Sequence, residues 1–188
     1  MTANMKRFKI GTTLISSNIK EAAMFKKLMI GNDHGGVDSK WHILRYLQQA
    51  GYEVVNIGSD SNDIVRYPYY AARVATAVSA GEVDAGILIC STGIGMSIIA
   101  NKFKNIRASV CTSHYMAMMT RRHNNSNILC LGGKITGQFE MEDILAAWLE
   151  NEYEGGRHAI SLTMIADGEN RLLTGRGWQP PQDLEQHS

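Results

Sequence analysis

Residues Gly86 to Lys102 read Gly-Ile-Leu-Ile-Cys-Ser-Thr-Gly-Ile-Gly-Met-Ser-Ile-Ile-Ala-Asn-Lys, and this stretch decides the predicted fold. Its first part is a short apolar run, typical of a buried strand, that ends at Cys90. Gly93 and Gly95 then indicate the start of a helix. A thiol, hydroxyl groups and free backbone N–H groups therefore meet where open α/β sheets bind ligands. Since a helix N-terminus favours an anion and the thiolate form of a nearby cysteine, we expect a site suited to holding a sugar phosphate and removing a proton from carbon.

Outside this stretch, short apolar runs alternate regularly with segments at helical spacing. Strands are expected over residues 28–31, 53–57, 85–89, 106–110 and 127–131. Helices are expected from residue 37 to Gly51, from Pro68, from Gly93, through residues 115–119 and over 140–150, with Trp41 on the inward face of the first. Five strand–helix units predict an α/β fold with one parallel sheet and helices on both faces.

Composition narrows the function classes. The chain has 188 residues, enough for one α/β domain, and its 19 basic and 18 acidic side chains give a net charge of +1. This balance gives no support for nucleic-acid binding, and no apolar stretch approaches the roughly 18 residues of a membrane span. Three cysteines without zinc-site spacing indicate free thiols in a reducing cytoplasm. Cys111 and Cys130 each end an apolar run, and we interpret both as small buried side chains.

The two ends of the chain differ from the middle. Residues 1–23 carry lysines without the apolar core of a secretory signal, and we describe them as an N-terminal extension of undecided order. Residues 24–166 form the predicted domain. Residues 167–188 are predicted to be an irregular tail because they contain several glycines and two prolines, although Trp178 indicates that the tail docks somewhere.

Three further segments carry residues suited to chemistry, and each also has a structural interpretation. In Asn32–Gly36, on the same predicted sheet edge as Cys90, Asp33 is either a helix N-cap or a ligand contact. In Arg121–Asn125 the basic residues either cap a helix against its dipole, or His123 moves protons near neutral pH. The glycine pair before Arg157 and His158 predicts either a solvated turn or a loop aimed at an oxyanion.

Other patterns are excluded or weak. The glycines after the first strand lack the spacing of a dinucleotide fingerprint, so no nicotinamide cofactor is expected. No pair of histidines has ligand spacing with a carboxylate, so no metal is expected. Ser97 and Asn101 are explained equally well as residues that stabilise their helix.

The segments match one family in order and spacing over about three quarters of the chain. The matching pieces are Asp33–Gly36, Tyr67–Pro68, Gly81–Asp84, Gly86–Cys90, Thr92–Ser97, Ala100–Lys102, Ile106–Ala108, His123–Asn124 and Gly155–His158. From about Met24 to Ile165 the chain resembles ribose-5-phosphate isomerase B and the related galactose-6-phosphate isomerase subunits. The resemblance implies a Rossmann-like three-layer α/β/α sandwich that forms homodimers, often paired into tetramers. It also implies active sites between subunits, with the last segment reaching into the partner.

The resemblance implies a metal-free aldose–ketose isomerisation through a cis-enediolate, without a cofactor. Cys90 would move the proton between C2 and C1, Thr92 would support its thiolate, and His123 would help to open the sugar ring. The backbone from Ser91 to Gly95 would hold the enediolate oxygen. The remaining implied substrate contacts are Asp33 and Tyr67 at the sugar hydroxyls, His34, Arg157 and His158 at the phosphate, and Ile94, Ser97, Asn124 and Lys134 around them.

Four positions depart from the family pattern. Ser91 replaces a usual glycine, Arg66 a usual aspartate, and Ser161 and Lys134 usual arginines. Since lysine is not equivalent to arginine in a phosphate site, we expect a sugar phosphate other than ribose 5-phosphate, either a tetrose, another pentose or a hexose. Two alternatives remain open: a subunit that needs a different partner chain, and a non-catalytic sugar-phosphate sensor.

Overall fold

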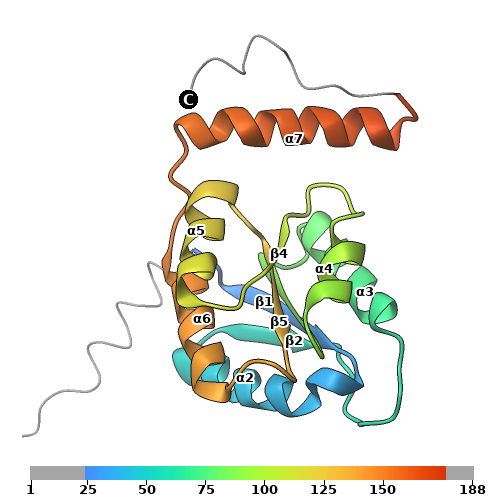
Figure 1. The fold of residues 1–188 in the computed structure, drawn as a ribbon, viewed down its shortest axis with the longest axis vertical. Coiled ribbons are helices and arrows are strands. Elements are labelled where there is room, and N and C mark those ends of the chain that lie inside the picture. The colour runs from blue at the N-terminus through green and yellow to red at the C-terminus, as the bar shows by residue number, and fades with distance from the viewer. Residues whose placement is uncertain (1–23, 177–188) are drawn as a thin grey trace, which may run out of the picture.

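The computed structural model describes residues 24–176, which form one parallel five-stranded sheet with helices on both faces (Figure 1). The strands are β1 (Lys27–Asn32), β2 (Glu53–Asn56), β3 (Ala85–Cys90), β4 (Ala108–Val110) and β5 (Ile128–Gly132). The helices are the short 3₁₀ turn η1 (His34–Gly36), then α2 (Val37–Ala50), α3 (Tyr67–Ser79), α4 (Ile94–Ala100), α5 (His114–Asn124), α6 (Gln138–Glu150) and α7 (Arg157–Leu173). The predicted extension 1–23 and the end of the predicted tail, with Trp178, lie outside the described residues.

Two apolar clusters define the layers of the fold. One joins the sheet to α2, α5 and α6 and includes the fully buried Trp148, whose ring stacks on Phe25 at 5.2 Å between centroids. The other joins the opposite face of the sheet to α3 and α4. Figure 1 shows the same division, with α2 and α6 on one side of the strands and α3 and α4 on the other. The predicted three-layer α/β/α sandwich is therefore confirmed.

The strand order alone indicates where a ligand would bind. The order is β2-β1-β3-β5-β4, and all neighbours are parallel. The chain leaves β1 toward β2 on one side and leaves β3 toward β5 and β4 on the other. Such a switch point opens a crevice at the carboxyl ends of the two central strands. The loops after Asn32 and Cys90 border this crevice.

Two expectations about the helices are wrong. Trp41 is 43% exposed, because the buried stripe of α2 runs one residue away through Lys40, Leu44 and Leu47. The segment from Asp167 is not irregular, since α7 continues to Leu173. An ion pair between Arg171 and Asp167 and hydrogen bonds from the Asn105 N–H to the Glu169 carboxylate favour the helix across Gly168, which alone would disfavour it.

Within the described residues, none of the helices combines the length and apolar character that crossing a bilayer requires.

Candidate active site

Cys90 ends a strand whose six residues are all buried, and its own side chain is 6% exposed. The chain turns sharply at Gly93, whose φ of +77° suits glycine, before α4 begins at Ile94. This turn brings the Gly93 N–H to 3.1 Å from the Cys90 sulfur, and the Thr92 hydroxyl accepts the Ile94 N–H at 3.4 Å. The predicted arrangement of thiol and helix start is therefore present.

The other two cysteines differ from Cys90 in their surroundings. All three are free, but burial raises the pKa of Cys111 to about 12 and the pKa of Cys130 well above its usual range. Both are at most 1% exposed. They are the small buried side chains that the sequence predicts, whereas Cys90 lies at the crevice.

The loop after β1 packs directly against the loop after β3. Asp33 is buried and its carboxylate accepts the Gly35 N–H at 2.8 Å, so its capping role is present. His34 accepts the Val65 N–H at Nδ1 over 3.3 Å, which leaves Nε2 to carry the proton of the neutral ring. These bonds hold both side chains at the predicted edge.

The Ser91 side chain, one of the departures from the family pattern, packs against the same loop. A Cβ atom added at Gly35 would lie 2.4 Å from the Ser91 Oγ and 2.9 Å from its backbone nitrogen. The Ser91 hydroxyl therefore lies over Gly35, where only a glycine leaves it room. The extra side chain is directed at the Asp33 loop.

This packing makes a first prediction. Gly35→Ala should destabilise the protein by roughly 1–3 kcal/mol, as other overpacking changes do, because the new methyl group displaces Ser91. In a Ser91→Gly background the cost should be smaller, since the closest atom is gone. Urea unfolding of the four proteins of this cycle measures the coupling. Gly137→Ala is the control because nothing lies within 4 Å of its Cβ position, and equal costs of Gly35→Ala in both backgrounds would contradict the placement of Ser91.

Tyr67 and the segment after β5 also contact the Cys90 turn and the start of α4. A Cβ atom at Gly95 would lie 2.8 Å from the Tyr67 Cζ, so the tyrosine ring packs against the first turn of α4. The Lys134 N–H donates to the Ser91 carbonyl at 3.1 Å, which places Lys134 at this edge with an exposed side chain. Ser97 donates to the Ile94 carbonyl at 2.9 Å within α4, so its helix-stabilising role is present.

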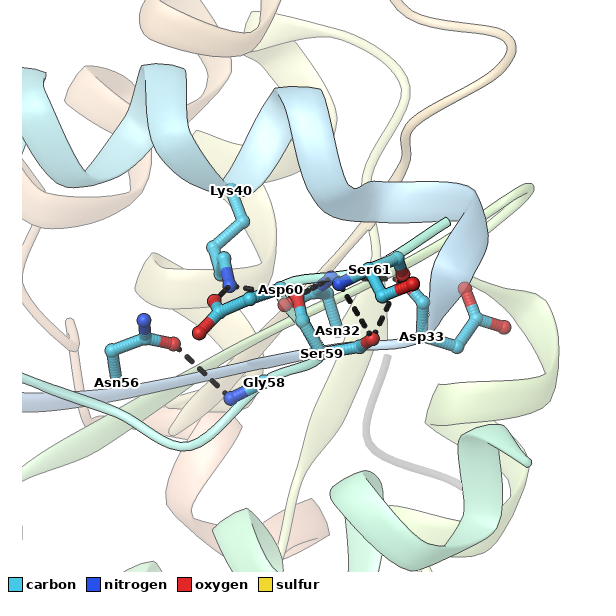
Figure 2. A network of polar contacts seen from close by, with 8 residues as sticks. All are labelled: Asn32, Asp33, Lys40, Asn56, Gly58, Ser59, Asp60 and Ser61. Carbon is cyan, nitrogen blue, oxygen red and sulfur yellow. Dashed lines mark hydrogen bonds and ion pairs between the residues drawn. The ribbon is translucent and has the colours of Figure 1, made fainter. Parts of the chain in front are cut away.

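A polar network behind Asp33 fixes the loop that follows β2 (Figure 2). Asn32 donates from Nδ2 to the carbonyls of Asp33 and Ser59, at 2.8 and 3.0 Å. Lys40 is fully buried on α2 and reaches the Ser59 carbonyl at 2.7 Å and the Asp60 carboxylate. The Lys40 ammonium lowers the pKa of Asp60 by hydrogen bonding and by its charge. This network ties the Asp33 loop to the segment that leads to Tyr67, and nothing in the sequence indicates a buried lysine.

The remaining predicted residues form a second group elsewhere. His123 and Asn124 end α5, while Arg157 and His158 begin α7 after Gly155 and Gly156, both at positive φ. The predicted loop at Arg157 is therefore the first turn of a helix. The His123 and His158 rings stack with centroids 3.9 Å apart, a contact across 35 residues that spacing could not predict.

Glu154 is the member of this second group that sequence reasoning missed. Its Oε2 lies 3.7 Å from the Nε2 atoms of both His123 and His158, and its Oε1 contacts Arg122. The ligand atoms of the two histidines and Glu154 lie within 4.8 Å of one another. Because the two rings are only 17° from parallel, the in-plane bonding directions of their Nε2 atoms run side by side, which suits two N–H donors to one carboxylate better than two ligands of one metal ion.

Within one chain, the Cys90 group lies at the carboxyl ends of the strands and the His123 group lies at their amino ends. In the β3–β5 register Gly86 pairs with Ile128 and Cys90 with Gly132. The start of β5 is thus four residues, or about 13 Å, back along the sheet from Cys90. His123 precedes that start. In Figure 1 α7, which carries His158, correspondingly runs across one end of the molecule, beside the end of α5.

Comparisons with known proteins agree with this fold and these motifs. A model of the family described as Ribose/Galactose Isomerase matches residues 28–165. The chain is 46% identical over 146 residues to ribose-5-phosphate isomerase B of Escherichia coli (strain K12), covering 78% of this chain and 98% of that protein. It is 38% identical to D-erythrulose-4-phosphate isomerase of Pectobacterium atrosepticum, covering 77% and 95%. A solved ribose-5-phosphate isomerase B from Clostridium thermocellum superposes with a TM-score of 0.77 at 47% identity, covering 78% and 99%.

The fold and the crevice define an α/β protein with a cysteine at its switch point. The chain belongs to the Ribose/Galactose Isomerase family, as the resemblance predicts.

Proposed function

We propose that this protein interconverts an aldose phosphate and a ketose phosphate through a cis-enediolate, with Cys90 as the base. The observation that carries the proposal is the Gly93 N–H donated to the Cys90 sulfur at the switch point of the sheet. A thiolate is the reactive form of cysteine, and the first turn of α4 lies directly beside this sulfur. Family membership supports the reaction class.

The proposed chemistry balances within one site. The Cys90 thiolate takes the proton from C2 of the open-chain aldose, and the electron pair forms the C1–C2 double bond of an enediolate. Backbone N–H groups from Ser91 to Gly95 stabilise the negative oxygen, while one proton moves between O2 and O1. The Cys90 thiol then returns its proton to C1 and leaves the ketose. Thr92 supports the thiolate by holding the turn through the Ile94 N–H.

Ring opening needs a second group, which we assign to His123 of the partner protomer. A ring-forming aldose phosphate must lose the proton of O1 and gain one at the ring oxygen, and an imidazole can move both. In one chain His123 lies at the amino ends of the strands, whereas Cys90 lies at their carboxyl ends, so the two cannot act on one substrate. We therefore propose a homodimer, or a tetramer of two such dimers, in which each site combines the Cys90 group of one protomer with the His123 group of its partner.

The last helix supports this arrangement. Among the described elements, α7 packs against α5, and it leaves the apolar side chains Ile160, Ile165, Leu172 and Leu173 exposed, the last three along a cavity that α7 forms with Asn101 and residues 106–109. A second copy of the chain would cover these side chains. The same packing would carry Arg157 and His158, at the N-terminus of α7, into the partner's crevice opposite Asp33 and Tyr67 at the sugar and His34 at the phosphate end. Asn124 would enter beside His123.

We further infer that ribose 5-phosphate is not the preferred substrate. The phosphate end has Lys134 and Ser161 where arginines are usual in the family, and Arg66, at the start of α3, adds a cation on another side. Lysine offers a point charge in place of a bidentate fork, so the optimal position of the phosphate differs. One relative of this chain is named for a four-carbon sugar phosphate. A tetrose, another pentose or a hexose phosphate is the expected optimum.

A kinetic panel tests both statements. The purified chain alone, assayed with aldose phosphates of four, five and six carbons, should turn over at least one, and its highest kcat/KM should not be with ribose 5-phosphate. A maximum at ribose 5-phosphate would overturn the substrate inference but leave the isomerase. Binding without turnover would favour a sensor, and turnover only after addition of a second, different chain would favour a hetero-oligomeric subunit. The three free thiols support a cytoplasmic location.

A further inference from the structure

We propose that Glu154 is a positioning residue that holds His123 for ring opening, an inference that rests on the proposed function. The two oxygens of the Glu154 carboxylate contact different groups. Oε1 is held by the Arg122 guanidinium, and Oε2 lies 3.7 Å from the Nε2 atoms of both histidines. The Glu154 N–H also donates to the Arg122 carbonyl at 3.0 Å, so backbone and side chain are fixed together.

The position of Glu154 selects one nitrogen of His123 for chemistry. With Nε2 directed at a carboxylate, the neutral ring keeps its proton on Nε2 and presents the lone pair of Nδ1. A carboxylate orients a catalytic imidazole in this way in general, and such contacts are often longer than a hydrogen bond in apo structures and tighten in the substrate complex. Nδ1 is then the atom that takes the proton from O1 and delivers one to the ring oxygen.

The stacked His158 ring limits the charge of the pair. Two imidazolium rings 3.9 Å apart would repel each other, so protonation of one ring disfavours protonation of the other. Partial burial lowers the pKa of His158, and the neighbouring His123 and Arg157 lower it further, while Glu154 opposes them. Glu154 is thus the one group among these that favours the protonated form of His158, and Arg122, Arg157 and His123 are the other charged or titratable groups around it.

The test uses one variant, one matched control and two reactions. Glu154→Gln keeps the size of the side chain and removes its charge. Glu152→Gln makes the same charge change two residues away, at an exposed position of the same segment. Ribose 5-phosphate is largely a furanose and needs ring opening. Ribulose 5-phosphate cannot close a furanose ring because its O5 carries the phosphate, so exchange of its C1 proton in deuterium oxide reports the Cys90 step alone.

Glu154→Gln should lower kcat for ribose 5-phosphate by about tenfold or more, a part of the roughly 10²–10⁴-fold that general acid–base catalysis supplies. Exchange at C1 of ribulose 5-phosphate should stay within about threefold of wild type, since the base is untouched. Glu152→Gln should change neither reaction. An NMR titration should show a lower pKa for His158 in Glu154→Gln, and an unchanged pKa would contradict the contact itself.

Two results would overturn the inference while leaving the isomerase in place: an equal loss in both reactions, which marks a structural role, or no loss in either. If the wild-type protein neither isomerises ribose 5-phosphate nor exchanges ribulose 5-phosphate, wild type and variants are assayed with the ring-forming aldose phosphate that the wild type turns over fastest. Turnover of none refutes the proposed function instead, and with it this inference.

Discussion

Replacing Cys90 with alanine should lower kcat by at least about 10²-fold, because a positioned proton-transfer group contributes roughly 10²–10⁴-fold. The thiol is the only titratable side chain on β3, and the Gly93 N–H is aimed at its sulfur. The loss should appear equally in aldose turnover and in proton exchange from the ketose, since both pass through the same enediolate. Stopped assays with enzyme at high concentration measure the residual rate.

The control for Cys90→Ala is Cys111→Ala, which removes another buried thiol from the same sheet region. Its raised pKa of about 12 keeps Cys111 protonated, so this variant should lose stability and retain kcat within about twofold. Retention of activity within about tenfold of wild type in Cys90→Ala would count against Cys90 as the base.

Replacing His123 with alanine should have the second largest effect. Turnover of a ring-forming aldose phosphate should fall by about 10²-fold, because no group then moves the protons of ring opening. Exchange at C1 of the open-chain ketose should be retained, unlike in Cys90→Ala. His114→Ala, at the exposed first turn of the same helix, is the control and should leave both reactions unchanged. Parallel loss of both reactions in His123→Ala would assign His123 a different role.

The sequence predicts the sheet and the place of Cys90 at its switch point well because their signals are local. The apolar runs before Asn32 and Cys90 and the glycines at 93 and 95 each mark a turn that follows from adjacent residues. Parallel strands bring those two turns to one edge without further information. The capping role of Asp33 is visible for the same reason.

The features that sequence reasoning missed depend on contacts between distant segments. From the sequence, Lys40 is expected to be a solvent-facing residue of a helix. Its burial is favourable because its ammonium group contacts the Ser59 carbonyl and the Asp60 carboxylate. Gly168 reads as a helix breaker, yet α7 continues because Glu169 binds the Asn105 N–H. Glu154 meets His123 across 31 residues, and its sole sequence signal is an acid directly before the Gly-Gly-Arg-His motif.

The edge at which His123 lies could also be predicted from topology. A residue just before a strand lies at the opposite edge from a residue just after a parallel neighbour. His123 precedes β5 and Cys90 ends β3, so the chain separates them. What the sequence cannot supply is the partner surface that would bring them together in the proposed homodimer, because that surface depends on the packing of α7.

Mixing the two inactive variants tests the central claim most directly. Cys90→Ala and His123→Ala homodimers each have two defective shared sites, whereas a mixed dimer has one site with both residues intact. Random re-pairing after mild denaturation should therefore restore about a quarter of wild-type turnover of a ring-forming aldose phosphate. If mixed dimers, isolated by two different affinity tags, are no more active than their parents, the site is not shared between protomers and this account is wrong.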